Sequence, residues 1–221
     1  MDTLRMKTNP SPGVLITFCG LDGCGKTTMI NLLSKELKEL GYEVFITKQP
    51  TDDVRNSDIF RTYMDSPDHN KYEYRSLSLL AASDRIQHSA KTIEPELEQG
   101  KIVISDRYFY SCLANLRARG FENDKWIYEI SESVIKPDIA YFIDVPVETA
   151  IERVRKRKEE KDRYVDVELQ KKLRHEYLSI AGLNDGVIMS SLDTQAELAE
   201  RVLTNAIKAI EKKRSCKNNE N

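Results

Sequence analysis

The chain has 221 residues, a length that suits one large α/β domain with a single hydrophobic core. Its 34 basic and 36 acidic residues leave a net charge of −2, which removes any general reason to expect a nucleic acid or a membrane surface as partner. No apolar run approaches the roughly 20 residues of a membrane span, and the N-terminus lacks the apolar core of a signal peptide.

The first 50 residues predict a strand, a loop, a helix and a second strand. Residues 1–13 are polar and predict a flexible leader. The β-branched, apolar run Val14–Cys19 is typical of a buried parallel strand, and apolar residues then recur at helical spacing from Met29 to Leu40. Residues 42–47 predict the second strand, which completes a right-handed βαβ unit.

The rest of the chain continues to alternate helices and strands. The predicted elements are a helix over about 72–98, strands over 102–105, 139–143 and 187–189, a helix with Pro146 as its first residue, and a helix opened by the capping box Thr194-x-x-Glu197. No linker is long enough to separate two domains. We therefore expect one three-layer α/β domain over 14–211, with a five-stranded parallel sheet between helices, and a polar tail over 212–221.

A glycine-rich loop, GLDGCGKTT, joins the first strand to the first helix and contains the pattern Gly20-x-x-x-x-Gly25-Lys26-Thr27. Glycines cost backbone entropy, so their place at a helix start indicates a need for bare backbone N–H groups around phosphates. Lys26 is placed to reach the β- and γ-phosphates of a nucleoside triphosphate, and the Thr27 hydroxyl to bind Mg²⁺. The other predicted residues of this site are Asp22, Gly23, Cys24 and Thr28.

Asp106-Arg107-Tyr108 follows the third strand, where ligands collect in open parallel sheets. Asp106 is a candidate to bind Mg²⁺ or orient the attacking oxygen, and Arg107 to neutralise phosphate charge; the alternative is a structural ion pair.

A switch GTPase is excluded because no Asp-x-x-Gly follows the glycine loop. The four cysteines have neither metal-ligand nor disulfide spacing, which favours a reduced, cytoplasmic setting.

The charged run RVRKRKEEKDRY contains Arg153, Arg155, Arg157 and Arg163. It is interpreted either as a solvated helix end or as a lid whose arginines fold over the transferring phosphoryl group. A separate arginine, Arg85, lies on a largely apolar predicted helix. Such a side chain needs a ligand or a carboxylate, and Asp84 is the carboxylate nearest in sequence.

From about Val14 to Ile210 the chain resembles the thymidylate kinase family. The segments that carry the resemblance are GLDGCGKTT, LLAASDR, GKIVISDRY, KPDIAYFIDVPVETAIERVRKR and KDRYVD. The resemblance implies a P-loop kinase fold with a short lid at about 153–165. It also implies ATP- and Mg²⁺-dependent transfer of the γ-phosphoryl group to a deoxynucleoside monophosphate, with dTMP as the expected acceptor, and a homodimer.

The resemblance also implies roles for individual residues. Asp22 corresponds to the carboxylate that meets the acceptor's sugar hydroxyl, and Arg107 to the arginine between the two phosphates. Arg85 corresponds to the residue that reads the thymine carbonyl, and Tyr108 is expected in the same substrate site. Position 23 is glycine rather than the loop arginine of some members, so the resemblance assigns the catalytic arginine to the lid.

Within the lid, Arg155 and Arg163 are the expected catalytic residues. Other positions depart from the family pattern. Lys48 takes the place of an arginine for the acceptor phosphate, and so keeps the charge but loses the bidentate fork. The acceptor pocket differs more. Ala81 replaces a ring that stacks on thymine, Cys112 a base-reading amide, and Asn115 a ring against the deoxyribose.

These departures predict a weaker KM for dTMP and some activity on dUMP or a ribonucleotide. A strict enzyme would need another ring, and Tyr74 and Phe109 are the candidates. Two other functions stay open: a kinase of the same fold acting on another nucleotide, a nucleoside or a small metabolite, and a non-catalytic ATP-binding regulatory protein. The intact Lys26, Asp106 and Arg107 argue against the second.

Overall fold

A computed structural model describes residues 3–65, 71–158, 165–190 and 193–218. The strands are β1 (Val14–Cys19), β2 (Val44–Lys48), β3 (Ile102–Asp106), β4 (Ile139–Asp144) and β5 (Val187–Ser190). The helices are α1 (Lys26–Glu39), α2 (Asp52–Arg55), α3 (Asp58–Asp65), α4 (Tyr74–His88), the π-helical η1 (Ser89–Ile93), α5 (Glu94–Glu98), α6 (Tyr110–Arg117), α7 (Trp126–Ser131), α8 (Val147–Arg155), α9 (Val167–Leu183) and α10 (Gln195–Asn218).

The sheet is entirely parallel, with the strand order β2-β3-β1-β4-β5. β1, which leads into the glycine loop, is central. Its register pairs Phe18 with Asp106 of β3, and β2 pairs Lys48 with the same Asp106. Because all carboxyl ends of parallel strands meet at one edge, the loop, Lys48 and Asp106 lie together there. The expected three-layer α/β fold with a five-stranded parallel sheet is confirmed.

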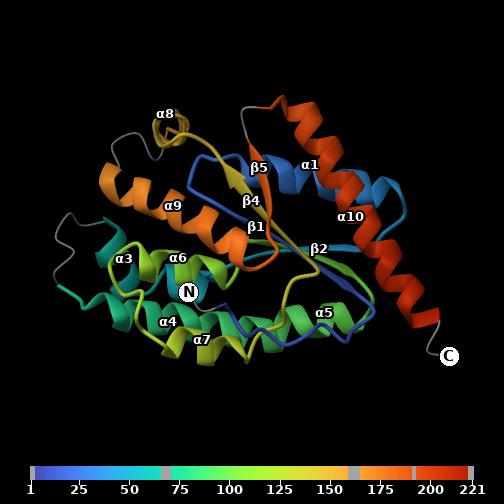
Figure 1. The fold of residues 1–221 in the computed structure, drawn as a ribbon, viewed down its shortest axis with the longest axis horizontal. Helices are drawn as coiled ribbons and strands as arrows, with labels where there is room; N and C mark the ends of the chain where they lie inside the picture. Colours follow the sequence, from blue (N-terminus) through green and yellow to red (C-terminus); the bar gives the residue numbers. More distant parts are fainter. Residues whose placement is uncertain (1–2, 66–70, 159–164, 191–192, 219–221) are drawn as a thin grey trace.

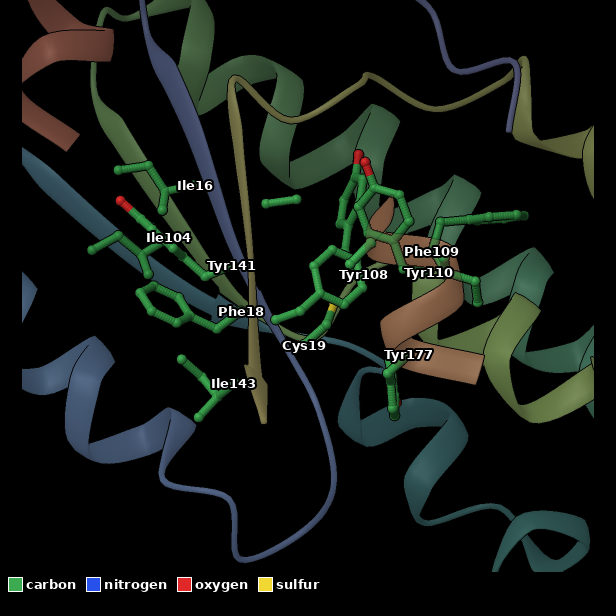
Figure 2. Close-up of a cluster of buried hydrophobic side chains, with 14 of the residues drawn as sticks. Ile16, Phe18, Cys19, Ile104, Tyr108, Phe109, Tyr110, Tyr141, Ile143 and Tyr177 are labelled. Carbon is green, nitrogen blue, oxygen red and sulfur yellow. The ribbon is translucent and has the colours of Figure 1, made fainter. Parts of the chain in front are cut away.

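Helices cover both faces of this sheet. α1 and α10 pack against each other on one face, and the other face is covered by α4, α5, α6 and α9 (Figure 1). Figure 2 shows the aromatic core between the layers. Phe18 stacks on Tyr141 with ring centroids 5.0 Å apart, and Tyr110 meets Phe142 edge-on at 5.3 Å. These buried rings fix the ends of β1 and β4, from which the site is built.

The N-terminal segment is packed rather than flexible in its described residues. The backbone N–H of Lys7 donates to the Val134 carbonyl at 3.0 Å, and the Lys136 N–H donates to the Lys7 carbonyl at 2.7 Å. The Asn9 amide donates to Asp138 at 2.8 Å. The polar composition of this segment predicted a flexible leader. Composition could not reveal that its backbone pairs with a segment more than 100 residues away.

The capping box of α10 forms as predicted. The Glu197 N–H donates to Thr194 Oγ1 at 3.3 Å, and the Thr194 N–H donates to Glu197 Oε2 at 2.9 Å. The helix then continues to Asn218, past the expected start of the polar tail at residue 212. Lys213 binds Asp138 at 2.9 Å, so this ion pair holds the start of the tail against the domain.

Two other predicted boundaries differ slightly. The long helix expected over 72–98 is α4, η1 and α5 in succession. Pro146 is the N-cap of α8, one position before its first helical residue. In the parts of the chain that the structure describes, no helix has a stretch long and apolar enough to cross a membrane.

Candidate functional site

A cavity of about 780 Å³ opens at the carboxyl edge of the sheet. Its lining residues come from the glycine loop, the ends of β2 and β3, and helices α3, α4, α6 and α8. The predicted site residues that line it are Asp22, Gly23, Cys24, Gly25, Lys26, Thr27, Thr28, Lys48, Arg85, Asp106, Arg107, Cys112 and Asn115. Most of the predicted site is therefore brought together around one space.

The glycine loop needs its glycines for two different reasons. Gly23 has φ +82°, and a Cβ there would collide with the Ala150 carbonyl oxygen of α8. Gly25, the N-cap of α1, has φ +107°, and a Cβ there would meet no atom within 4 Å. The first glycine permits close packing, and the second permits a left-handed turn that exposes the N–H groups of the helix start.

Lys26 is buried at the start of α1. Its ammonium donates to the carbonyl oxygens of Leu21 at 2.8 Å and Gly20 at 3.2 Å. Gly20 does not line the cavity. It contributes through its carbonyl oxygen, which accepts hydrogen bonds from both Lys26 and Arg107. The loop thus holds a positive charge beside the free N–H groups of a helix N-terminus, an arrangement that binds phosphate.

Arg107 turns into the cavity because its φ is +68°, a left-handed conformation unusual for arginine. Its Nη2 donates to Asp22 at 2.5 Å and its Nη1 to the Tyr177 hydroxyl at 2.9 Å. Burial is the largest single effect and lowers the pKa of Arg107, but the electrostatic influence of Asp22, Tyr177 and Asp106 and the hydrogen bond to Asp22 together raise this pKa above its ordinary value. Arg107 is therefore a fixed cation.

The same turn sends Tyr108 the other way, so the prediction that Tyr108 contacts the acceptor is wrong. Its side chain is fully buried and does not line the cavity. Its hydroxyl donates to the Ile135 carbonyl at 2.7 Å, and burial raises its pKa. Tyr108 therefore packs in the core, where Figure 2 shows it beside Tyr110.

A cluster of three cations lies beside Asp106: Lys48 at the end of β2, Arg55 at the end of α2, and Arg107. Burial and then the Arg55 charge lower the pKa of Lys48. Burial and then the Arg107 charge lower the pKa of Arg55. Mutual repulsion of this kind favours a bound anion.

Arg55 was not identified as a site residue from the sequence. The segment TDDVR could have revealed it, since an acidic start and a basic end are typical of a short helix.

Asp106 and Thr27 are suitably placed for a magnesium ion. Both line the cavity, and Thr27 is the second residue of α1. Asp106 Oδ1 is buried, and no described side chain or backbone group bonds it. The described residues contain no group of three or more histidine, cysteine, aspartate or glutamate side chains that could bind a metal. One carboxylate and one hydroxyl fit Mg²⁺, which binds few protein ligands and takes others from phosphates and water.

Aromatic side chains line the cavity near the first turn of α4. Tyr63 of α3 and Tyr74 of α4 line it, and the Arg119 guanidinium lies over both rings, 5.5 Å and 4.1 Å from their centroids. Phe60 of α3 also lines the cavity, and in the described residues no ring pair involves it. Phe109, one of the candidates for the missing ring, is instead fully buried and does not line the cavity.

Asn115 lines the cavity, but its amide is already occupied. Nδ2 donates to the Ser111 carbonyl at 2.9 Å, and Oδ1 accepts from Arg119 Nη1 at 2.9 Å. Arg119 Nε also donates to the Tyr63 hydroxyl at 2.8 Å. Asn115 therefore positions Arg119. Its amide retains a second N–H and a second lone pair, so the expected tolerance of a 2′-hydroxyl stays a prediction. Arg119 gave no sequence signal because its partners lie on three different helices.

Arg85 is buried along the cavity wall. Its Nη1 donates to the Ala81 carbonyl at 2.8 Å, and its Nε to the Tyr108 carbonyl at 3.4 Å. Asp84, the carboxylate nearest in sequence, instead accepts from the Thr51 N–H at 2.9 Å and from its hydroxyl. Among the described residues its hydrogen-bond partners are backbone carbonyls, which leave the Arg85 charge available for a ligand.

The predicted lid is only partly described. Arg153 and Arg157 line the cavity, together with Ala150 and Val154. Arg155 does not line it, because residues three or four apart share a helix side and Arg155 lies off that side. The assignment of Arg155 to the cavity is therefore corrected to Arg153 and Arg157. Arg163 lies outside the described residues.

Known proteins resemble this chain over most of its length. The profile described as "Thymidylate kinase" matches residues 18–204. A "Probable thymidylate kinase" of Pyrococcus horikoshii is 40% identical over 171 residues, which cover 76% of this chain and 83% of that protein. Another, of Thermococcus kodakarensis, is 40% identical over 173 residues, covering 76% and 84%. A "Thymidylate kinase" of a Sulfurihydrogenibium species is 37% identical over 174 residues, covering 76% and 83%.

Proposed function

The chain belongs to the thymidylate kinase family, and from that membership we propose how it phosphorylates dTMP to dTDP in the cavity described above. The phosphate loop and the cation cluster of Lys48, Arg55 and Arg107 face the same space. This juxtaposition carries the proposal, because phosphoryl transfer requires two phosphates held close together and in line.

In the proposed donor site, ATP binds with its phosphates along the loop from Asp22 to Thr28. Lys26 exchanges its contacts with the Leu21 and Gly20 carbonyls for the β- and γ-phosphates. The Thr27 hydroxyl and Asp106 would hold Mg²⁺, which neutralises phosphate charge when bound. These groups already line the cavity before the substrates bind, which limits the reorganisation needed at the transition state.

In the proposed acceptor site, the cation cluster binds the phosphate of dTMP. An oxygen of that phosphate attacks the γ-phosphorus of ATP, and the bond from this phosphorus to the bridging oxygen of ADP breaks. Arg107 lies between the two phosphates, oriented by Asp22 and Tyr177. The base extends toward α3 and α4, where Arg85 reads a carbonyl and Phe60 offers a ring in place of Ala81.

An acceptor panel tests this function directly. With saturating ATP, we expect dTMP to give the highest kcat/KM among dTMP, dUMP, UMP and AMP, measured as ADP release. One methyl group in an apolar pocket is worth roughly ten- to two-hundredfold, which sets the expected preference for dTMP over dUMP. Thymidine without its phosphate is the control, because it cannot use the cation cluster. Preference for AMP or for thymidine would contradict the acceptor assignment.

The lid gives a second prediction. If Arg153 and Arg157 stabilise charge on the transferring phosphoryl group, Arg153→Ala or Arg157→Ala should lower kcat about tenfold or more, with a smaller change in KM for ATP. Arg155→Ala is the matched control, since Arg155 lies between Arg153 and Arg157 in the chain but does not line the cavity. Steady-state kinetics of the three variants distinguish the alternatives. Wild-type kcat in both cavity variants would mean that this run is a solvated helix end.

A homodimer and a cytoplasmic setting belong to the same proposal. Family membership supports the dimer. The setting is supported by the cysteines, since Cys19, Cys24 and Cys112 are buried free thiols. Burial raises the pKa of Cys19 to about 12, so this thiol is protonated and unreactive at neutral pH.

A further inference from the structure

The side-chain hydroxyl of Ser78, on α4, is buried in the cavity wall without a hydrogen bond to any described residue. The residue is 2% exposed and lines the cavity. Its Oγ is buried, and among the residues that the structure describes it has no hydrogen-bond partner. Ser111, another buried serine of the cavity wall, is paired, since its Oγ accepts from the Tyr177 hydroxyl at 3.1 Å. A buried hydroxyl left unpaired destabilises the free protein, so its presence indicates a ligand.

The position of Ser78 indicates which part of a ligand it meets. Ser78, Tyr74, Ala81 and Arg85 are three or four residues apart and line the cavity from one side of α4. The cation cluster is at the other end of this wall, beside the carboxyl ends of β2 and β3. A nucleotide whose phosphate is bound by that cluster therefore directs its base toward Ser78.

We propose that Ser78 is a specificity-determining residue whose hydroxyl hydrogen-bonds the polar edge of the acceptor's pyrimidine base. The inference rests on the proposed function, because it takes the dTMP phosphate to be bound by the cation cluster. A serine hydroxyl both donates and accepts, so it pairs with a ring carbonyl or with the ring N–H. The Oγ position depends on one torsion, χ1, so a change of rotamer is enough to move the hydroxyl when a ligand binds.

The neighbouring side chains leave this contact to Ser78. Ala81, one turn along α4, carries no polar group and is too short to intervene. Cys112 faces the cavity from α6, which packs against α4 (Figure 1), but a thiol is only a weak donor. With no amide at position 112, the polar groups at this wall are the Ser78 hydroxyl, the Arg85 guanidinium and the Tyr74 hydroxyl, and Ser78 lies between the other two along α4.

The variant Ser78→Ala separates a ligand role from a structural one. It removes only the Oγ atom, favours the helix, and deletes an unpaired buried hydroxyl. The free variant should therefore melt at the wild-type temperature or above it. Its KM for dTMP should nevertheless rise about three- to tenfold, the effect of losing one neutral hydrogen bond, with kcat and the KM for ATP unchanged. Improved stability with weakened acceptor binding is a combination that a structural role does not produce.

Two controls sharpen the test. Ser83→Ala makes the same substitution on an exposed position of α4 that does not line the cavity, and should change neither KM. The second control uses a dTMP analogue in which a difluorotoluene ring of the same shape replaces thymine. Because that ring lacks the polar edge of thymine, its Kd by calorimetry should be the same for wild type and Ser78→Ala.

Three results would overturn the inference alone: an unchanged KM for dTMP in Ser78→Ala, a rise shared by dTMP and ATP, or equal weakening of the analogue. A wild-type enzyme that does not phosphorylate dTMP would instead overturn the proposed function, and the inference with it.

Discussion

Replacing Lys26 with alanine is expected to lower kcat at least about 100-fold while leaving the protein folded. The ammonium is buried against the Leu21 and Gly20 carbonyls, at the end of the loop whose N–H groups would cradle the phosphates. Losing one preorganised charge at the transition state costs roughly 10²- to 10³-fold in rate. Turnover at saturating ATP and dTMP, together with the melting temperature, measures the two parts of this expectation.

Lys35→Ala is the matched control, because Lys35 lies on the same helix and forms a surface ion pair with Glu39. Exposed pairs of this kind contribute little to stability, so this variant should retain wild-type turnover. Near-normal ADP formation by Lys26→Ala under the same conditions would remove Lys26 from the donor site.

Arg107→Ala is expected to have an effect of similar size, a loss of roughly 10²- to 10³-fold in kcat. The guanidinium is fixed by Asp22 and Tyr177, so it meets the phosphates already oriented. Arg107→Lys should recover only part of the activity, because lysine keeps the charge but loses the planar fork. Circular dichroism and melting temperature establish that both variants fold before their rates are compared.

The control for Arg107 is another ion pair at a strand end. Arg174 binds the Asp144 carboxylate at the end of β4 through bonds of 2.7 and 2.8 Å and does not line the cavity. Arg174→Ala should therefore change stability more than kcat. If Arg107→Ala lost no more activity than Arg174→Ala, the alternative interpretation of Asp106-Arg107 as a structural pair would hold.

Much of the donor side could be predicted from the sequence, because its information is local. The glycines, Lys26 and Thr27 are neighbours along the chain, and the strand and helix that flank them have clear apolar periodicity. The end of β3 was equally predictable, since parallel strands bring their carboxyl ends to one edge wherever they lie in the chain.

The residues of the acceptor side could be assigned only from the tertiary structure. Arg119 gains its role from Tyr63, Tyr74 and Asn115, which belong to α3, α4 and α6. The sequence also offered Asn115 as a free amide and Tyr108 as a ligand. Hydrogen bonds to Ser111 and Arg119, each four positions away, engage the first, and the left-handed turn at Arg107 is followed by burial of the second.

The sequence by itself determined the layered α/β fold, the phosphate loop and the family to which the chain belongs. Only the tertiary structure decided that Arg153 and Arg157 line the cavity, that Arg55 joins Lys48 and Arg107, and that the Ser78 hydroxyl has no partner among the described residues. The physical reason is the range of the interactions. Backbone conformation and apolar periodicity depend on residues within a few positions of one another, whereas pairing of buried polar groups depends on partners that only packing brings together.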